Sequence, residues 1–399
     1  MGAVYVAGVG MTKFGRSPQT LTELCCEAAS RALSDSSIQE VEALYLGVMN
    51  PEEFTGDSNI ASRIAEALGL TGLPALRIET AGATMPALAA MITERYRKRY
   101  RLSPARLERL LCRVAMKNHL NGARNPCAQF QQAITEQNYF SSKFVSTPLR
   151  LYDCSPITDG AAAAILTSEK TDVSVSGVGQ GTGPVSLRER DSFTSFRATQ
   201  MAAARAYRMA GISPKEIDFA EVHDAFTSFE IISTEDLGFF PAGRGGDAVE
   251  EGKTAVDGPL PVNPSGGLKS RGHPVGASGV AQLVEVVRGL RGSAGVKLKR
   301  EAKRALAQST GGLGTNNFVT IVERTDSPLI KNLPLPPSPA PGRKRPSIKR
   351  SQPPALSEEG RIETFTILYV TPDGFLPPLA LALIRDRQGS LFMAQGEDV

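Results

Sequence analysis

The sequence predicts an α/β fold made of two related halves. The segment VSVSGVG at 173–179 repeats VYVAGVG at 4–10, and a predicted helix follows each of them. The strand-like NNFVTIVER at 316–324 has a counterpart in DGAAAAILTSE at 159–169. Internal duplication of a strand–helix pattern favours two stacked α/β halves with mostly parallel sheets.

Hydrophobic periodicity places the elements of the first half. We expect strands at 5–9, 43–48 and 77–81, and helices at 22–33 and 58–68. The run at 43–48 is expected to be buried. The helix at 58–68 should end at Gly69, because glycine is common just after a helix end. Cys25 and Cys26 fall inside the first helix and are expected to pack rather than react.

The second half should contain helices at 200–209 and 279–290 and strands at 304–308 and 316–324. The first half has no counterpart of the second half's 279–290 helix and 304–308 strand. There, RIETA ends at Ala81 and runs directly into a tyrosine- and arginine-rich helix. We therefore expect one helix and one strand to be missing from the first half. The GVGQGTG run at 177–183 opens no helix, so a dinucleotide site is unfavoured.

Composition excludes several classes of protein. A net charge of +4 over 399 residues is too weak to indicate nucleic-acid binding. No apolar run is long enough to span a bilayer, and the N-terminus resembles a strand more than a signal peptide. Five cysteines without a CxxC pair indicate a reducing compartment, with neither a disulfide framework nor a zinc site. We expect a soluble cytoplasmic protein with no bound metal.

A glycine-dense stretch at 263–282 leads into the predicted 279–290 helix and carries His273. Glycines permit sharp turns and close backbone approach, and a helix start offers free N–H groups to a carbonyl oxygen or anion. A histidine held there is suited to proton transfer. The alternative is a glycine-rich turn with a capping histidine. A second histidine segment, EVHDAF at 221–226, favours the functional interpretation.

Five segments together resemble the thiolase superfamily, in its order. They are KNHLNGARNPCAQF (117–130), DCSPITDGAAA (153–163), HDAF (223–226), NPSGGLKSRGHPVGASG (263–279) and GGLGT (311–315). The likeness is strongest to the acetyl-CoA acetyltransferase branch related to the thiolase of sterol carrier protein X, and it covers about residues 3–325. It implies a duplicated five-layered fold, a coenzyme A thioester as substrate and no bound cofactor.

The resemblance assigns roles to particular residues. His273 would be the base and would also contribute to an oxyanion hole, and His223 would hold a water or carbonyl oxygen that stabilises an enolate. Candidate substrate and coenzyme A contacts are Ser155, Asn263, Gly266, Gly267 and Ser278. Ser265 is a further plausible contact of the thioester arm, although a serine in a turn is more often a local hydrogen-bonder. We expect His119 to be structural, within a hydrogen-bonded loop. The basic cluster of residues 95–101 is expected to be a solvated helix face rather than a phosphate site.

The family's nucleophilic cysteine follows ETA directly, but Gly82 stands there in this chain. Cys112, Cys127 and Cys154 do not match the nucleophile position. The second family cysteine, the acid/base one, is also absent, and Gln308 and Ser309 occupy its neighbourhood. Because no acyl-enzyme could form, we expect little or no thiolysis.

The expected domains are a thiolase-like N-terminal half at 1–170 with a loop insertion at about 82–150, a C-terminal half at 171–325, a proline-rich basic linker at 326–357 and a partial domain at 358–399. The last part shows three strands separated by PDG/PP and RQG turns, and it resembles the start of the OB-fold domain that accompanies thiolase-like chains. An OB barrel needs five strands. We expect an incomplete barrel that pairs with another chain, as a homo-oligomer or with an OB-fold partner.

Three functions remain open from the sequence. The first is an acyl-CoA C-acyltransferase acting on 3-oxoacyl-CoA, impaired by loss of the thiol. The second is a thiolase-like aldolase that acts with an OB-fold partner on a 3-hydroxyacyl-CoA, as for a steroid side chain. The third is a non-catalytic subunit or a deletion product.

Overall fold

The computed structural model describes residues 4–36, 38, 41–48, 60–70, 75–78, 85–184, 190–295 and 298–326, and the strands at 360–368, 379–386 and 391–396. The chain divides into two units, residues 1–335 and 336–399. The strands of the first unit are β1 (Val4–Met11), β2 (Leu44–Gly47), β3 (Ala75–Ile78), β4 (Phe144–Ser146), β5 (Leu149–Arg150), β6 (Ala162–Thr167), β7 (Val173–Thr182), β8 (Phe219–Glu221), β9 (Arg304–Gly311) and β10 (Asn316–Arg324). Its α-helices are α1 (Leu21–Asp35), α3 (Ile60–Ala67), α4 (Met85–Arg99), α5 (Pro104–Gly122), α6 (Glu136–Ser141), α7 (Arg197–Ala210), α8 (Thr227–Asp236), α9 (Gly245–Glu250), α10 (Gly267–Arg271) and α11 (Ser278–Leu290).

A six-stranded sheet in the order β6-β1-β7-β10-β9-β8 joins the two halves. Its pairings are antiparallel except for β8 with β9. The prediction of mostly parallel sheets is therefore wrong. The GGLGT turn is too short for a crossover, so β9 and β10 must run antiparallel. The last strand of each half, β6 or β10, likewise runs antiparallel to that half's first strand.

The first strand of each half packs against the first helix of that half through glycines. On these glycines an added Cβ would lie only 1.9–2.4 Å from a carbonyl oxygen of the helix. The positions are Gly8 and Gly10 against α1, and Gly177, Gly179 and Gly181 against α7. Because each glycine lets a helix backbone rest directly on the sheet, both halves repeat one packing unit. The duplication seen in the sequence thus corresponds to a repeated contact.

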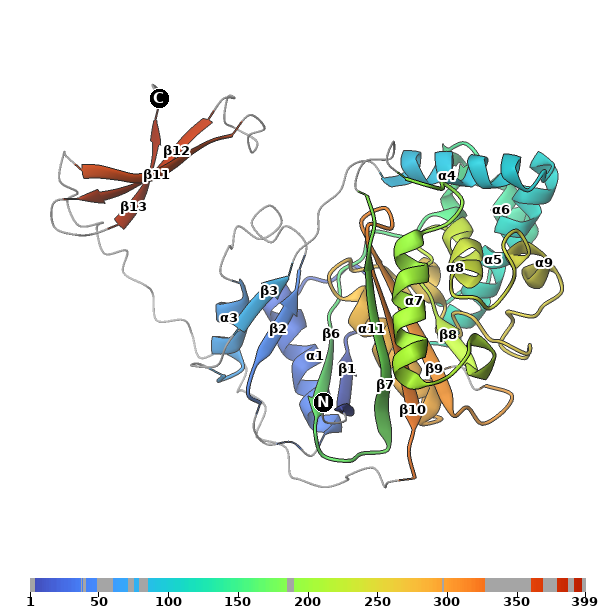
Figure 1. The fold of residues 1–399 in the computed structure, drawn as a ribbon, viewed down its shortest axis with the longest axis horizontal. Coiled ribbons are helices and arrows are strands. Elements are labelled where there is room, and N and C mark those ends of the chain that lie inside the picture. The colour runs from blue at the N-terminus through green and yellow to red at the C-terminus, as the bar shows by residue number, and fades with distance from the viewer. Residues whose placement is uncertain are drawn as a thin grey trace. The chain divides into compact units, whose positions relative to one another are not determined.

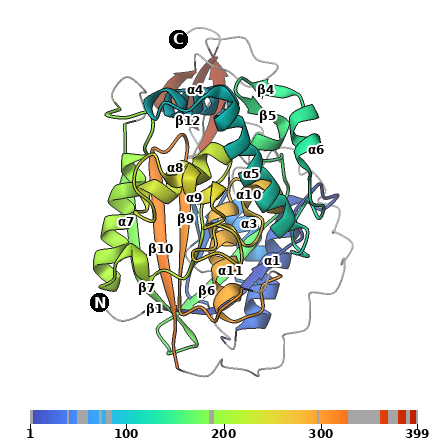
Figure 2. The same cartoon turned by 90° about the vertical axis from the view of Figure 1, so that its right-hand side faces the viewer.

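Helix α11 packs against strands of both halves. Val284 and Val287 of α11 share a hydrophobic cluster with Val9 and Met11 of β1 and with Ala305 of β9. On the other face of the second-half strands, a separate cluster holds α7 against β9 and β10. Figure 2 shows α7 and α1 on opposite sides of the strands, with α11 between them. This is the layered α/β arrangement that the resemblance implied.

Strands β2 and β3 form a separate two-stranded parallel sheet. In the second half, β9 lies between β8 and β10. Among the described residues no strand takes the corresponding place between β2 and β6. Without that neighbour, β2 alternates between half-buried and exposed positions, and Tyr45 is 70% exposed. The prediction of a buried strand at 43–48 is therefore wrong, and residues 79–81 of the predicted third strand lie outside the described residues.

A group of helices gathers beside β8 and β9 (Figure 1). Side chains of α4, α5, α6 and α8 share one hydrophobic cluster, which also receives Phe226 and Leu268. This cluster fixes the loops that follow β8 and precede α10. Within the described ranges, no helix is long and apolar enough to cross a membrane.

The second unit is a three-stranded antiparallel sheet in the order β11-β12-β13. Its strands are β11 (Gly360–Leu368), β12 (Leu379–Asp386) and β13 (Leu391–Gly396). The prediction of three strands in this segment is confirmed. The predicted turns between them lie outside the described residues.

Candidate active site

Four segments that are far apart in the sequence meet at the carboxyl end of β8. They are the segments around residues 118–125, 155–158, 223–225 and 265–273. The hydrogen bonds that join them are Asn118 Nδ2 to Asp224 Oδ2 (2.7 Å), Asn125 Nδ2 to Ser265 O (2.9 Å), Ser155 N to Ala225 O (2.8 Å) and His273 N to Thr158 Oγ1 (2.9 Å). Four of the five motifs recognised in the sequence therefore meet here.

The centre of this site is a pair of histidines. The ring centroids of His223 and His273 are 5.1 Å apart, and the rings meet edge to face at 88°. His223 is buried and its backbone N–H donates to Gln308 Oε1 at 2.9 Å. His273 is half-buried on the turn between α10 and α11. The two imidazoles come from different segments and are in direct ring contact.

The hydrogen bonds of His273 favour one tautomer of its ring. Its Nδ1 lies 2.7 Å from Ser278 Oγ, and Ser278 Oγ donates its proton to Pro274 O at 2.9 Å. With its single proton directed at Pro274 O, the Ser278 hydroxyl accepts a hydrogen bond from Nδ1–H of the neutral ring. Nε2 then keeps its lone pair, and it makes no hydrogen bond to any described residue. His273 is thus arranged as a base at Nε2.

Both imidazoles are held in the neutral form. Burial lowers the pKa of His273 to about 4, and the positive charge of Arg271 acts in the same direction. Burial likewise lowers the pKa of His223 well below its usual value, followed by the effects of His273 and Arg271. At neutral pH neither ring is charged, so each can accept or donate a proton in a reaction.

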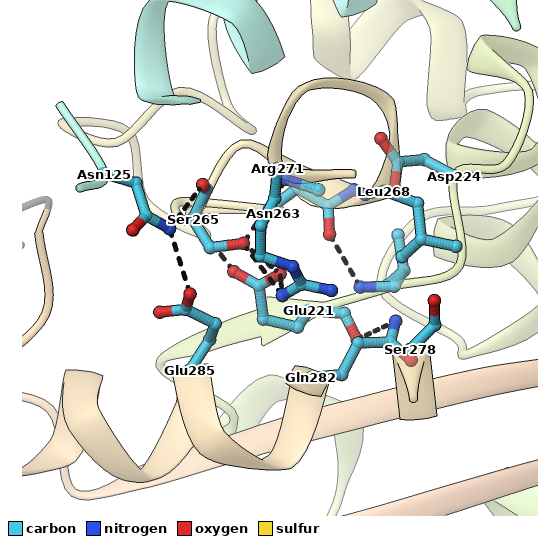
Figure 3. Close-up of polar contacts among 12 residues, drawn as sticks. Asn125, Glu221, Asp224, Asn263, Ser265, Leu268, Arg271, Ser278, Gln282 and Glu285 are labelled. Atoms are coloured by element: carbon cyan, nitrogen blue, oxygen red, sulfur yellow. Dashed lines mark hydrogen bonds and ion pairs between the residues drawn. The ribbon is translucent and has the colours of Figure 1, made fainter. Parts of the chain in front are cut away.

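Figure 3 shows a buried polar network that includes Glu221, Ser265 and Arg271. The carboxylate of Glu221 accepts hydrogen bonds from Ser265 N at 2.9 Å and Ser265 Oγ at 2.7 Å. Arg271 Nη1 lies 3.2 Å from Ser265 Oγ and 3.5 Å from Glu221 Oε2. Burial raises the pKa of Glu221 to about 7, although Arg271 opposes this. From α11, Gln282 donates to the carbonyl oxygens of Glu221 and Gln308.

The predicted contact residues of the NPSGG segment are Asn263, Gly266 and Gly267, and they pack against the loop that follows β8 and against α5. Asn263 has a φ of 54°, and its side chain bonds Val222 N and Glu230 Oε2, each at 2.8 Å. Gly267 has a φ of 59°, and an added Cβ would lie 2.3 Å from Asp224 Oδ2. Gly266 lies against the backbone of Gly122. These residues use their backbone shape and polar atoms to hold the loop after β8.

Of the predicted serines, Ser278 contacts His273 directly, as described above. Ser155 is half-buried beside the loop that carries His223, and its hydroxyl makes no hydrogen bond to any described residue. Sequence reasoning missed Arg271, Glu221, Thr158 and Gln282 as residues of the site. Arg271 and Glu221 stand within or next to the recognised motifs, but only the fold shows that they are buried together.

None of the five cysteines, all of which the structure describes, hydrogen-bonds to either imidazole. Burial raises the pKa of the Cys25, Cys112 and Cys154 thiols to about 12, and it raises the pKa of Cys26 as well. A thiol with a raised pKa is a poor nucleophile at neutral pH. In the described residues, no group of three or more histidine, cysteine or acidic side chains could hold a metal ion.

His119 lies outside the pair. It is buried in α5, where its ring stacks on Phe130 and meets the edge of Tyr152, with centroid distances of 5.5 Å. The expected loop at this position is wrong, because α5 continues to Gly122. In the basic cluster, Arg97 is bonded to Glu94 and to Leu102 O. The other members, Arg95, Lys98, Arg99 and Arg101, are exposed.

Comparison with known proteins agrees with the fold and the motifs. Residues 179–324 match the family model described as thiolase C-terminal domain-like. Acetyl-CoA acetyltransferase of Methanothermobacter thermautotrophicus is 36% identical over 384 residues, which cover 80% of this chain and 99% of that protein. Bovine sterol carrier protein 2 is 32% identical over 394 residues, which cover 80% of this chain and 72% of that protein.

Among solved structures, the Ltp2-ChsH2(DUF35) aldolase superposes with a TM-score of 0.69 at 21% identity, over 81% of this chain and 98% of that one. This likeness shows the fold, while the 36% identity to a full-length relative shows descent. With the histidine motifs joined in one site on a duplicated α/β scaffold, the chain belongs to the thiolase superfamily.

Proposed function

We propose that this chain acts on acyl-CoA thioesters by acid/base chemistry at the His223–His273 pair, making or breaking a carbon–carbon bond next to the thioester carbonyl. The observation that carries the proposal is the edge-to-face contact of two neutral imidazoles, with centroids 5.1 Å apart. In this role the chain is an acyltransferase of the thiolase family by descent. Its chemistry is limited to the steps that need no thiol.

In this reaction His273 is the base and His223 is the hydrogen-bond donor. Nε2 of His273 removes a proton from the carbon next to the thioester carbonyl. An N–H of His223 donates to the thioester oxygen, where negative charge develops as the enolate forms. Such a donor can contribute roughly 2.7–4 kcal/mol to the transition state. We further propose that the half-buried Ser155 contacts the thioester arm of coenzyme A.

Several observations argue against thiolysis. No described thiol bonds to the pair, and four of the five thiols have a raised pKa. No strand lies between β2 and β6 in the described residues, which supports loss of the family segment that carries the nucleophile. The 384-residue alignment uses 80% of this 399-residue chain, so the acetyltransferase has tens of residues with no counterpart here.

A second candidate function is a retro-aldol cleavage of a 3-hydroxyacyl-CoA. His273 would take the proton of the 3-hydroxyl, the C2–C3 bond would break to release a carbonyl product, and the enolate left on the thioester would be protonated at C2. This needs only the two imidazoles. Two observations favour this function, namely the superposition on the Ltp2-ChsH2(DUF35) aldolase and the small β-unit with strands between 360 and 396. In this function the chain would act with an OB-fold partner.

The test is exchange of the α-protons of acetyl-CoA in D₂O, followed by mass spectrometry. We expect exchange with the wild-type chain and a loss of 100-fold or more, on the order of one catalytic acid–base group, in His273→Ala. His223→Ala should also lose exchange, and His223→Asn, which keeps an N–H donor, should retain part of it. His119→Gln is the matched control, since that histidine lies outside the site.

The same samples should show no covalent acetyl adduct after incubation with acetyl-CoA and no thiolysis of acetoacetyl-CoA. A trapped acyl-thioester would overturn the thiol-free mechanism. Absence of exchange in the wild-type chain would leave the non-catalytic interpretation. Cleavage of 3-hydroxyacyl-CoA substrates that depends on His223 would select the aldolase.

A further inference from the structure

Lys269 carries a buried amine that the protein leaves without a partner. The residue is 2% exposed on α10, a helix that packs against α5 (Figure 2). Its Nζ makes no hydrogen bond or ion pair with any described residue. It lies 5.5 Å from the centroid of the Phe130 ring and 5.8 Å from that of the Tyr152 ring. Because burying an ammonium without an anion costs free energy, this side chain weakens the fold unless a ligand binds it.

A lysine that serves the fold is bonded differently. Lys117, on α5, is also largely buried, and its Nζ lies 2.5 Å from Asn118 Oδ1, 2.7 Å from Val262 O and 3.0 Å from the carboxylate of Glu230. These three acceptors satisfy the three protons of its ammonium group. Lys269 has no such acceptor among the described residues.

The carboxylates near the amine of Lys269 are bonded to other donors. Asp153 and Asp224 both oppose the effect of burial, which lowers the pKa of the amine to about 8. Asp153 accepts hydrogen bonds from the hydroxyls of Tyr139 and Thr227. Asp224 accepts hydrogen bonds from Asn118 and from two backbone N–H groups of α10. Negative charge is thus nearby, but no described carboxylate bonds the amine.

The tip of the Lys269 side chain is accessible, although its stem is covered. Its Nζ, unlike the unpartnered nitrogens of Arg271, is not closed off from solvent. Phe130 is 37% exposed, and Tyr152 and Cys154 are half-buried. The amine therefore ends beside aromatic side chains that are themselves partly open to a ligand.

The two segments that contact this amine also lead to the histidine pair. Tyr152 lies three residues before Ser155, whose N–H donates to the loop that carries His223. The N–H of Phe130 donates to the backbone of α10, the helix that leads to His273. The unpartnered amine and the pair are thus built from the same segments of the chain.

We propose that Lys269, with Phe130 and Tyr152, binds a carboxylate at the far end of the acyl group, so that the substrate is a coenzyme A thioester of a dicarboxylic acid. The identification of this group as part of a substrate rests on the proposed function, whereas the binding of an acidic acyl-CoA does not depend on turnover. The carboxylate supplies the charge-assisted hydrogen bond that the ammonium lacks.

The chemistry of the ligand follows from the charge of the amine. An ammonium group needs an anion, and the arm of coenzyme A next to the thioester carries only neutral amide and hydroxyl groups. Its phosphates lie at the other end of the arm. A phosphate normally gathers several donors, such as the N–H groups of a helix start, whereas one amine beside two rings suits a single carboxylate.

The test is calorimetric binding of succinyl-, glutaryl- and adipoyl-CoA, each compared with its methyl ester, which has nearly the same shape but no negative charge. We expect the wild-type chain to bind at least one acid about tenfold or more tightly than its ester, as for one hydrogen bond to a charged group. Lys269→Met should bind acid and ester equally, and Lys269→Arg should keep a preference for the acid. Lys98→Met removes an exposed charge from α4 and should leave the preference unchanged.

Urea unfolding of the same variant shows whether the lysine serves the fold instead. Lys269→Met places an apolar side chain of similar length beside the two rings, so its stability should equal or exceed that of the wild-type chain. Lys117→Met should lose stability, because it leaves Glu230 buried without its cation. A Lys269→Met chain less stable than the wild-type chain would overturn the proposal. The comparison of acid with ester in the wild-type chain needs no variant to fold.

Equal binding of every acid and its ester by the wild-type chain would overturn this inference. An equal loss of affinity for coenzyme A itself in Lys269→Met would also overturn it, because the amine would then contact the coenzyme and not the acyl group. A preference for the acid without α-proton exchange would refute the proposed function but not this inference. Exchange without the preference would do the reverse, and failure to bind any acyl-CoA would refute both.

Discussion

The three histidines of this chain share one electrostatic property. Burial lowers the pKa of each, and in each case a positively charged neighbour adds to the effect. For His119 that neighbour is Lys269, and its pKa falls to about 4. Because unfolded histidines titrate near pH 6.5, the folded chain binds fewer protons than the unfolded chain between about pH 4 and 6.5. These groups make the free energy of unfolding rise as pH rises through that window.

His119→Gln should reduce this dependence without touching the active site. Between pH 6.5 and 5 the wild-type chain should lose roughly 2 kcal/mol more stability than the variant. The reason is that the variant lacks the buried imidazole, which takes up a proton in the unfolded chain but not in the folded one. Urea unfolding at the two pH values measures the difference. Buried acids with raised pKa, such as Asp153, act in the opposite direction. They are present in both proteins and cancel. If both proteins lost the same stability between pH 6.5 and 5, His119 would have the same pKa in the folded and the unfolded chain.

Short motifs made the histidine pair predictable. HDAF and GHP identify His223 and His273 locally, and the resemblance states that they face one substrate. Arg271 could not be predicted in the same way, although it stands in the same motif. Its burial depends on Phe14 and Glu221, which reach it from two other parts of the chain, and on Ser265 of the same motif.

Among the elements, the contact of β7 with α7 depends on glycine. A Cβ on Gly179 would lie 1.9 Å from Ala202 O, and backbone atoms of a helix cannot give way separately. Gly179→Ala should therefore push α7 off the sheet and destabilise the chain by about 3 kcal/mol, the upper range for overpacking.

Gly183, just after β7, is the matched control. The nearest atoms to its added Cβ are Gly314 O at 3.7 Å and Ala198 Cβ at 3.8 Å, an ordinary contact distance. Gly183→Ala should stay within about 0.5 kcal/mol of the wild-type chain. Urea unfolding of both variants measures the effect. Equal stabilities would mean that β7 and α7 are not in direct backbone contact.

Helices and strand positions were largely visible in the sequence, because periodicity is a local signal. The helices α1, α3, α7 and α11 lie where the pattern placed them. The direction of pairing and the exposure of β2 were not visible, because both depend on which strand lies alongside. The duplication predicted that the first half lacks a counterpart of β9, and the described residues contain none beside β2; the exposure of β2 appeared only in the fold.

At the scale of the whole molecule, the second unit is a sheet with two edges. Among the described residues neither β11 nor β13 has a second neighbour strand. Outward N–H groups on these strands should exchange with D₂O far faster than those of β7 and β10, because no ladder protects them. Hydrogen exchange followed by mass spectrometry measures this, with protection expected to rise when a partner chain covers an edge. Strong protection across 361–395 in a monomeric sample would contradict an incomplete barrel.

Helix α11 also affects the order in which the chain can fold during synthesis. The inner faces of β1 and β6 are covered by α11, which the ribosome makes more than a hundred residues after β6. Until residue 290 has emerged, the N-terminal strands have α1 on one side and no helix on the other. The nascent N-terminal half therefore exposes an apolar strand face until α11 is made, and we expect the two halves to complete their folding together.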